Sequence, residues 1–278
     1  MEYLIIIVGN FLIGGMIGLT GIAGFLLPML YSGFLGMSSA QGLALSFFAS
    51  LISGILGAYN YYRAKNLNLK PAVWISMGSF VGAVGGVRLN LLMEEGIVKK
   101  ILYLVVLLSG ISILLRKDEK EERKKSRPGQ KMPLWFWLAF GAVTGLICAL
   151  SGAGGPILVM PLLVVFGVPV KTAVGIALFN SIFIAVPSSI GYAMGCRPGD
   201  LLLLLPLSLV SHGIGVWIGS KNTSLIRPDV LKKGVAVFSV LLAILKLITG
   251  ERIHGSGSGR RGSPEALEER SLPEYKNV

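Results

Sequence analysis

The sequence predicts an all-α polytopic membrane protein built from two homologous repeats, and three observations support this prediction. Of the 278 residues, 53% are hydrophobic and 14% are charged, whereas soluble domains carry about 25% charged residues. The hydrophobic residues form eight long blocks, and a membrane-spanning helix needs ~20 such residues. Features of the first four blocks recur in the last four at a constant offset, as in many transporters.

The lengths of the blocks indicate how many helices to expect. They cover residues 3–36, 38–62, 70–93, 97–116, 133–168, 171–195, 200–220 and 231–250. The first block of each half is longer than one simple span and is interrupted by glycine and proline. We therefore expect each of these two blocks to form a broken helix or a helical hairpin, which allows up to about ten helices in all.

The interruption in the second half contains Ser151, Gly152, Gly154, Gly155 and Pro156. Within a helix, glycine costs ~1 kcal/mol and proline ~3 kcal/mol. Backbone groups that are freed at membrane depth must bond to protein or line a water-filled cavity. A helix that begins after this run would direct N–H groups and its positive dipole end into the membrane, which favours an anion. The alternative is that the glycines only allow close helix packing.

The first half carries a thinner version of the same run, in Gly21, Gly24 and Pro28, and Pro28 precedes Pro161 by 133 residues. The same offset relates Ala40/Ala173, Gly42/Gly175, Ala44/Ala177, Leu45/Leu178, Tyr59/Tyr192, Gly82/Gly215 and Gly86/Gly219. We interpret residues 1–116 and 133–250 as a tandem duplication. A charged linker, 117–132, joins the two repeats, and a flexible tail, 251–278, follows them.

Basic residues indicate how the two halves are oriented. Eight of the 26 Lys and Arg residues lie in residues 116–131, and basic loops stay on the cytoplasmic side. If each first block is a hairpin, the halves are inverted. Leaving aside Lys246 and the tail, the far side then holds only Arg88, Lys99, Lys100 and Arg197. A single crossing would make the halves parallel and the distribution more even. The sequence therefore favours inverted repeats and a cytoplasmic linker.

The composition also restricts the function. The net charge of +12 reflects the basic loop, so we expect no nucleic-acid partner. No Asp or Glu lies well inside a block, although cation pumps usually place carboxylates there. Two histidines and two scattered cysteines give no metal-ligand spacing, and no phosphate-binding loop motif is present. We expect no metal, no cofactor and no enzymatic activity.

Two polar residues inside the blocks are candidates for substrate contact. Asn180 could donate to an oxyanion or form an interhelical hydrogen bond. His212 is the one histidine within a predicted span and could bind a proton or an anion. Tyr59 and Tyr192 are predicted to lie at the membrane interface.

The motifs together resemble a known family. The glycine run before Pro161-Leu162-Leu163, followed by Ala173-Val174-Gly175-Ile176-Ala177-Leu178, has a counterpart in Pro28-Met29-Leu30 and Ala40-Gln41-Gly42-Leu43-Ala44-Leu45. Their order, spacing and duplication over residues 1–250 resemble the TauE/SafE sulfite exporter family of membrane permeases. The resemblance implies secondary transport of sulfur-containing anions such as sulfite and organosulfonates.

The sequence thus predicts a permease in the plasma (inner) membrane that moves a small sulfur-containing anion by alternating access. A permease for another small anion or a neutral metabolite is the alternative, and a membrane-embedded scaffold or enzyme is the alternative from a different class. The expected partners are the anionic substrate and the lipid bilayer, and a homodimer is left open. The candidate substrate-binding residues are Gly21, Gly24, Pro28, Ser151, Gly152, Gly154, Gly155, Pro156, Asn180 and His212.

Overall fold

The computed structural model describes residues 2–20, 23–114, 132–152, 155–196 and 204–221, with single positions at 199, 237, 240, 241 and 244. All regular structure within these residues is helical. The linker up to residue 131, nearly all of the last predicted block and the tail lie outside the described residues. The duplication and the relative orientation of the repeats therefore stay predictions.

The first half contains four helical segments, the first of them composite. They are α1 (Glu2–Thr20) with a 3-10 turn (Ala23–Phe25), the short α2 (Leu26–Pro28) and a π-helical stretch (Met29–Phe34), then α3 (Ser39–Arg63), α4 (Leu69–Leu92) and α5 (Glu95–Leu114). The second half contains α7 (Leu134–Ser151), α8 (Gly155–Val165), α9 (Val170–Met194) and α11 (Leu204–Lys221). These bounds follow the hydrophobic blocks closely, because the turns between them carry the polar caps.

Two of these caps are formed by side chains directly before the helices that they start. Ser38 starts α3 with a capping box, in which its hydroxyl accepts from the Gln41 N–H and the Gln41 side chain accepts from the Ser38 N–H. Asn68 starts α4 by accepting from the Lys70 N–H. Such caps satisfy N–H groups that a helix start leaves unpaired.

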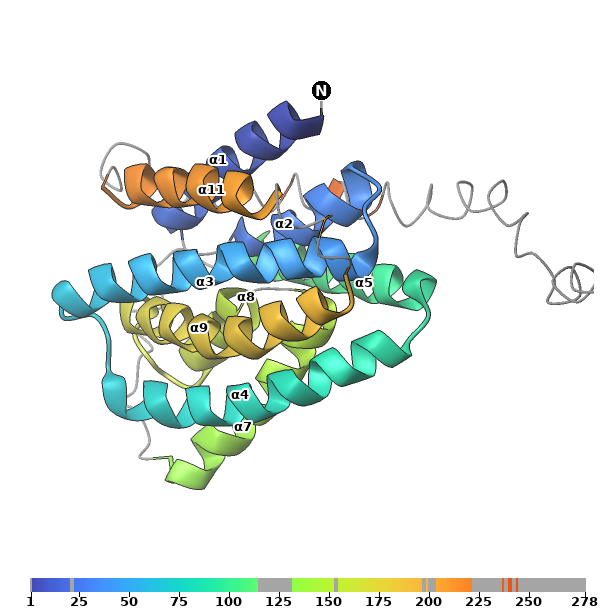
Figure 1. The fold of residues 1–278 in the computed structure, drawn as a ribbon. Coiled ribbons are helices and arrows are strands. Elements are labelled where there is room, and N and C mark those ends of the chain that lie inside the picture. Colours follow the sequence, from blue (N-terminus) through green and yellow to red (C-terminus); the bar gives the residue numbers. More distant parts are fainter. Residues whose placement is uncertain are drawn as a thin grey trace, which may run out of the picture.

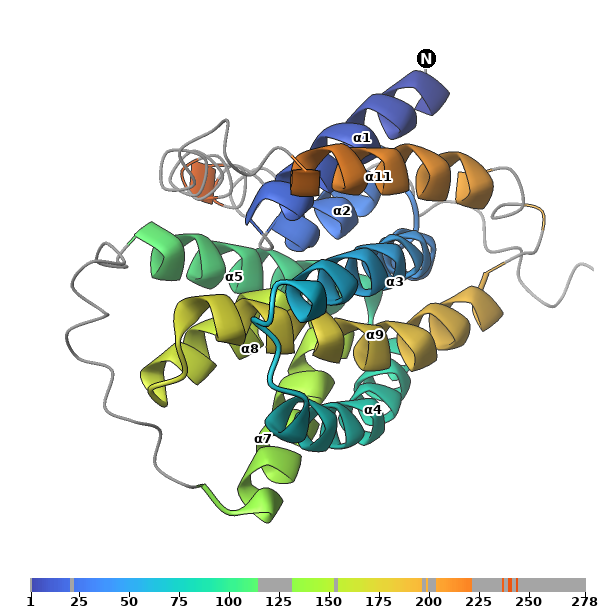
Figure 2. The ribbon, with the colours of Figure 1, turned by 90° about the vertical axis from the view of Figure 1, so that its left-hand side faces the viewer.

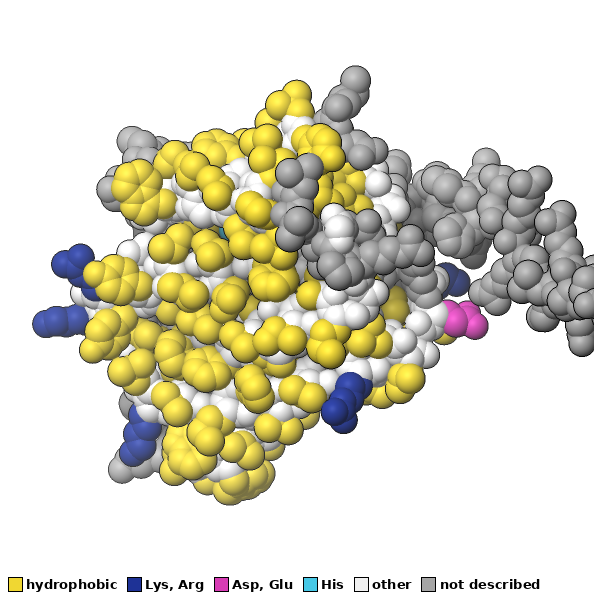
Figure 3. Space-filling view, viewed as in Figure 1, with side chains coloured by type: hydrophobic (Ala, Val, Ile, Leu, Met, Phe, Trp, Pro, Cys, Tyr) yellow, Lys and Arg dark blue, Asp and Glu magenta, His cyan; other side chains and the backbone are white. Residues whose placement is uncertain are grey.

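Four of the described helices are long and apolar enough to cross a membrane, in Ser39–Arg63, Leu69–Leu92, Leu134–Ser151 and Lys171–Met194. Figure 3 shows a largely hydrophobic face, with Lys and Arg side chains at the edge where α3 connects to α4. Both basic residues of α4, Lys70 and Arg88, are exposed, and the helical rise places them about 27 Å apart. This spacing matches the ~30 Å hydrocarbon core of a bilayer. The predicted all-α polytopic membrane fold is therefore confirmed.

Helices of the first half pack against helices of the second half. Helix α4 of the first half packs along α7 of the second, and α11 of the second half packs along α1 of the first. Figures 1 and 2 show the α1/α11 pair at one end of the bundle and the α4/α7 pair at the other, with α3, α8 and α9 between them. Helices α3 and α9 pack against each other in the middle.

Glycines bring the outer pairs into backbone contact. A Cβ on Gly82 of α4 would collide with the carbonyl of Ala142 on α7, and a Cβ on Gly215 of α11 would collide with the carbonyl of Phe11 on α1. Gly82 and Gly215 are the residues that the offset of 133 pairs. Close packing through small residues is the usual means of association in membranes, and the recurrence of this contact is what a duplication predicts.

Candidate functional site

The predicted interruptions of the first blocks are present. Helix α7 ends at Ser151, and Gly152 follows with a positive φ of 71°, a conformation that favours glycine. Helix α8 then begins at Gly155 with Pro156 in its first turn, where proline is tolerated because its missing N–H would be unpaired anyway.

In the first half, α1 ends at Thr20 and the 3-10 turn starts at Ala23. Gly24 lies in this turn, and a Cβ there would make an ordinary contact with Ile17. Two candidate residues, Gly21 and Gly154, lie outside the described residues.

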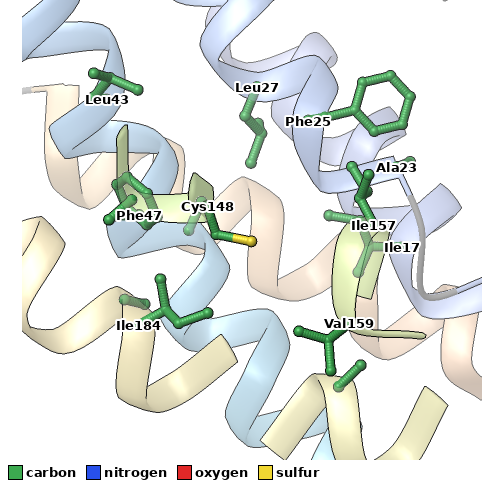
Figure 4. Packing of buried hydrophobic residues seen from close by; sticks show 14 of the residues in the cluster. Ile17, Ala23, Phe25, Leu27, Leu43, Phe47, Cys148, Ile157, Val159 and Ile184 are labelled. Carbon is green, nitrogen blue, oxygen red and sulfur yellow. The ribbon is translucent and has the colours of Figure 1, made fainter. Parts of the chain in front are cut away.

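The interruption of the second half contacts the first half. A Cβ on Gly152 would lie 3.0 Å from Cγ of Pro28 and would collide with Leu43 of α3. Pro28 is buried. Figure 4 shows apolar side chains of this region, among them Leu43 and Phe47 from α3, Cys148 from α7 and Ile157 from α8, all members of one core cluster. The structure therefore brings together two predicted site residues, Gly152 and Pro28, that are far apart in sequence.

Other helices supply partners for the carbonyl groups at the end of α7. The hydroxyl of Tyr192 on α9 donates to the Ala149 carbonyl at 2.8 Å, and Nδ2 of Asn90 on α4 donates to the Leu150 carbonyl at 2.6 Å. The last carbonyls of a helix lack partners within that helix, and inside a membrane the protein must provide them. These two side chains stabilise an α-helix end within the protein.

Ser151 and Tyr192 both form contacts within the protein, and substrate binding by Ser151 stays a prediction. The Ser151 hydroxyl donates to the carbonyl of Ile147 in its own helix, at 2.7 Å. The prediction of an interfacial Tyr192 is wrong: its side chain is fully buried and stacks on Phe47 with ring centroids 5.8 Å apart. Tyr59, its counterpart by the offset, is 57% exposed.

His212 occupies a buried position between α11, α3 and α1. Its Nε2 lies 2.5 Å from Oγ of Ser53 on α3, and the side chain is fully buried. Gly14 of α1 lets the helices approach, since a Cβ there would collide with the His212 carbonyl. Nδ1 has no hydrogen-bond partner among the described residues.

Asn10 and Tyr31 form a second part of this polar region that the sequence analysis missed. Nδ2 of Asn10 donates to the Tyr31 hydroxyl at 2.7 Å and to the Ile6 carbonyl at 2.8 Å. The hydroxyl of Ser208, on α11, also interacts with Tyr31. A polar residue inside the first apolar block was the available signal for Asn10.

Asn180 differs from these residues, because it is buried without partners. Its exposed fraction is 0%, and neither Nδ2 nor Oδ1 has a hydrogen-bond partner among the residues that the structure describes. The hydroxyls of Ser76 on α4 and Ser188 on α9 share this property. Buried polar groups are nearly always paired in proteins, so each of these groups is a position where a polar ligand or water can bind.

The described part of the chain contains no cluster of three or more His, Cys, Asp or Glu residues that could hold a metal ion. Cys148 is buried, and Cys196 is half-buried. The buried polar side chains that the structure describes are Asn, Ser, Thr and His. The interior therefore offers neutral hydrogen-bonding groups.

The structure is a helical membrane bundle with an interrupted helix in each half. The two interruptions meet in the interior beside neutral polar groups, and this arrangement defines a multi-pass membrane permease. A model of the family "Sulfite exporter TauE/SafE" matches residues 3–245, and the chain belongs to this family. The resemblance inferred from the duplicated motifs is therefore confirmed.

Curated relatives are named as transporters. The chain is 25% identical over 248 residues to the "Probable membrane transporter protein YdhB" of Bacillus subtilis, covering 88% of this chain and 100% of the relative. It is 26% identical over 262 residues to YjnA of the same organism, described in the same words, covering 89% and 100%. A relative from Methanocaldococcus jannaschii, also described as a probable membrane transporter protein, is 29% identical over 78% of this chain and 86% of its own length. No solved structure matches the chain.

Proposed function

We propose that this permease is a secondary transporter of small sulfur-containing anions, such as sulfite or organosulfonates, in the plasma (inner) membrane. Family membership supports transport as the activity. The contact between Gly152 and Pro28 carries the proposal for the mechanism, because it joins the interrupted helices of the two halves. Interrupted helices that meet in this way are typical of sites that alternate between the two sides of a membrane.

Alternating access requires one group of packed helices to move against another around a fixed site. Helix α1 packs along α11 and α4 packs along α7, and we propose that each of these two pairs moves as a unit. The central pair α3 and α9 lies between these units (Figure 2). We expect the candidate residues at the interruptions, including Gly24 and Gly155, to shape the backbone there.

The proposed substrate is an anion because the start of α8 follows the interruption. N–H groups at such a start are unpaired within the helix and attract negative charge. Asn180 supplies a neutral amide that can donate to an oxyanion. His212 is the proposed place where a proton would couple to transport, because it is a buried titratable group held by Ser53.

The partners are the anion and the bilayer, with a homodimer open and nucleic acid not expected. Neutral groups such as Asn180 also suit a neutral metabolite, and this is the second candidate function. We expect no enzymatic activity. A scaffold would have no vectorial uptake.

The test uses the purified protein in detergent and in liposomes. Sulfite, methanesulfonate, taurine, acetate and chloride are compared for thermal stabilisation, and a ligand at 100 times its Kd adds ~2.7 kcal/mol. Stabilisation by sulfite or a sulfonate, together with uptake of that anion into liposomes, is the expected result. Stabilisation by acetate alone, or by none of the anions, would contradict the sulfur-anion proposal.

A further inference from the structure

Within the part of the chain that the structure describes, the amide of Asn180 and the hydroxyl of Ser76 have no hydrogen-bond partner, and they lie on two helices that pack against each other, α9 and α4. Both residues are fully buried. Leaving a buried donor or acceptor without a partner destabilises the folded protein, and Asn180 carries both a donor group and an acceptor. A protein that keeps such groups unpaired in its interior gains this energy back when a ligand or water binds them.

Helix geometry places the two residues on facing sides. A Cβ on Gly54 of α3 would lie 2.7 Å from Oγ of Ser181, and a Cβ on Gly57 would lie 2.9 Å from Leu178. Helix α9 therefore runs antiparallel to α3. Because α3 and α4 follow one another through a short turn and run in opposite directions (Figure 1), α9 runs parallel to α4.

A second contact fixes the register of the α4–α9 pair. A Cβ on Gly191 of α9 would lie 2.6 Å from Cγ1 of Val87 on α4. Asn180 precedes Gly191 by 11 residues, and Ser76 precedes Val87 by 11 residues. Eleven residues are close to three helical turns, so Asn180 and Ser76 lie on the contacting faces of α9 and α4 and at a similar depth.

We propose that Ser76 and Asn180 form a neutral subsite between α4 and α9 that binds singly charged oxyanions and discriminates against doubly charged ones. This inference rests on the proposed function and specifies its substrate class. The N–H groups of Asn180 and the hydroxyl of Ser76 donate to oxygen atoms of the anion. Oδ1 of Asn180 accepts from a protonated oxygen, as in hydrogensulfite.

The charge discrimination follows from what surrounds the subsite. The charged residues of α4 and α9 are Lys70, Arg88 and Lys171, and all three are exposed. An anion at Asn180 therefore loses water and gains dipoles rather than a counter-charge. The cost of burying an ion in a low-dielectric medium is large and rises with the square of its charge, so a dianion loses far more than a monoanion.

The first experiment compares methanesulfonate, a monoanion, with sulfate, a dianion, by binding to the purified wild-type protein. We expect the Kd for methanesulfonate to be at least ~10-fold lower, a difference of ~1.4 kcal/mol. Sulfite is the second probe, and we expect its apparent affinity to rise as the pH falls and hydrogensulfite replaces the dianion. Equal affinities for methanesulfonate and sulfate would overturn the charge discrimination.

The second experiment locates the subsite with Asn180→Leu and Ser76→Ala. Ser181→Ala is the matched control, because the Ser181 hydroxyl already donates to the Leu178 carbonyl of its own helix at 2.7 Å. We expect Asn180→Leu to raise the unfolding temperature without ligand, since it removes unpaired buried groups, and to lose the shift that methanesulfonate causes. Ser76→Ala should weaken methanesulfonate binding, and Ser181→Ala should leave it unchanged.

The outcomes separate this inference from the proposed function. If Asn180→Leu keeps the methanesulfonate shift and lowers stability, Asn180 binds a structural water and the subsite is wrong. If Ser181→Ala weakens binding as much as Ser76→Ala does, the location is wrong. If no sulfur anion binds to or is transported by the wild-type protein, the proposed function fails, whereas binding of methanesulfonate that Asn180→Leu does not affect overturns only the subsite.

Discussion

The hydroxyl of Tyr192 donates a 2.8 Å hydrogen bond to the carbonyl of Ala149, and this bond joins α9 to the end of α7 beside the interruption. The Tyr192 ring is held from one side by Phe47 of α3. The bond and the stacking together fix the end of α7 against the two central helices. The position of Gly152, three residues after Ala149, depends on this arrangement.

Replacing Tyr192 by Phe is expected to lower the free energy of unfolding by about 1–3 kcal/mol, because the buried Ala149 carbonyl loses its donor while the stacking on Phe47 remains. Thermal unfolding in detergent measures the change. Tyr59→Phe is the matched control, since Tyr59 is exposed, and it should leave stability within ~0.5 kcal/mol. Equal effects of the two variants would contradict the role assigned to this bond.

Glycine contacts between the halves give a second prediction. Gly82→Ala and Gly215→Ala each place a Cβ against a carbonyl of the partner helix. Such overpacking typically costs about 1–3 kcal/mol. This cost exceeds the ~1 kcal/mol that alanine gains over glycine in a helix. Both variants should unfold at lower temperature than the wild-type protein.

The control for this prediction lies on the same helix as Gly82. A Cβ on Gly85 would meet only Cδ1 of Leu146, at 3.9 Å, which is an ordinary contact. Gly85→Ala should therefore keep or raise the unfolding temperature. If Gly85→Ala and Gly82→Ala destabilise the protein equally, helix propensity or lipid contact controls stability at these positions, and backbone contact with α7 does not.

The sequence predicted the interruptions well because their cause is local. Gly152 and Pro156 disfavour a continuous helix wherever they occur, so no knowledge of the partner helices was needed. Helix bounds were predictable for the same reason, since the caps at Ser38 and Asn68 lie within a few residues of the helices that they start.

The pairing of buried polar groups could not be predicted, because each partner belongs to a distant helix. Tyr59 and Tyr192 occupy equivalent positions in the sequence, yet one is exposed and the other is buried. The difference arises from Phe47 and Ala149, which meet Tyr192 only in the folded chain. The Asn10–Tyr31 pair was missed for the same reason.

Gly152 gives a third prediction, which separates backbone strain from crowding. Gly152→Ala places a residue with a side chain in a left-handed backbone conformation, at a cost of about 1–2 kcal/mol. The added Cβ would also collide with Leu43 and crowd Pro28. Gly36→Ala carries the strain alone, because Gly36 has a φ of 67° and no atom near its Cβ position. Gly152→Ala should therefore destabilise the protein more than Gly36→Ala and should also reduce uptake into liposomes, which Gly36→Ala should not. Equal losses of stability in the two variants would show that crowding against Pro28 and Leu43 does not contribute to the destabilisation by Gly152→Ala.

His212 provides the last prediction, which concerns proton coupling. Protonation adds a positive charge to the interior and favours an anion, so uptake by the wild-type protein is expected to rise as pH falls. Methanesulfonate is the probe because it stays a monoanion, and any pH dependence then belongs to the protein. Among the described residues of this polar region, Tyr31 is the other titratable side chain, and it is bonded to Asn10.

In His212→Gln, uptake of methanesulfonate should persist and lose its dependence on pH, because glutamine keeps a polar group beside Ser53 and does not titrate. Ser53→Ala is the comparison: it removes the partner of Nε2 but keeps the imidazole, so its uptake should still vary with pH. The Asn180 amide is unchanged in both variants, and methanesulfonate should therefore still stabilise both. A pH profile of His212→Gln that matches that of the wild-type protein would show that the proton binds elsewhere, and that the contact of His212 with Ser53 serves only to hold α11 against α3.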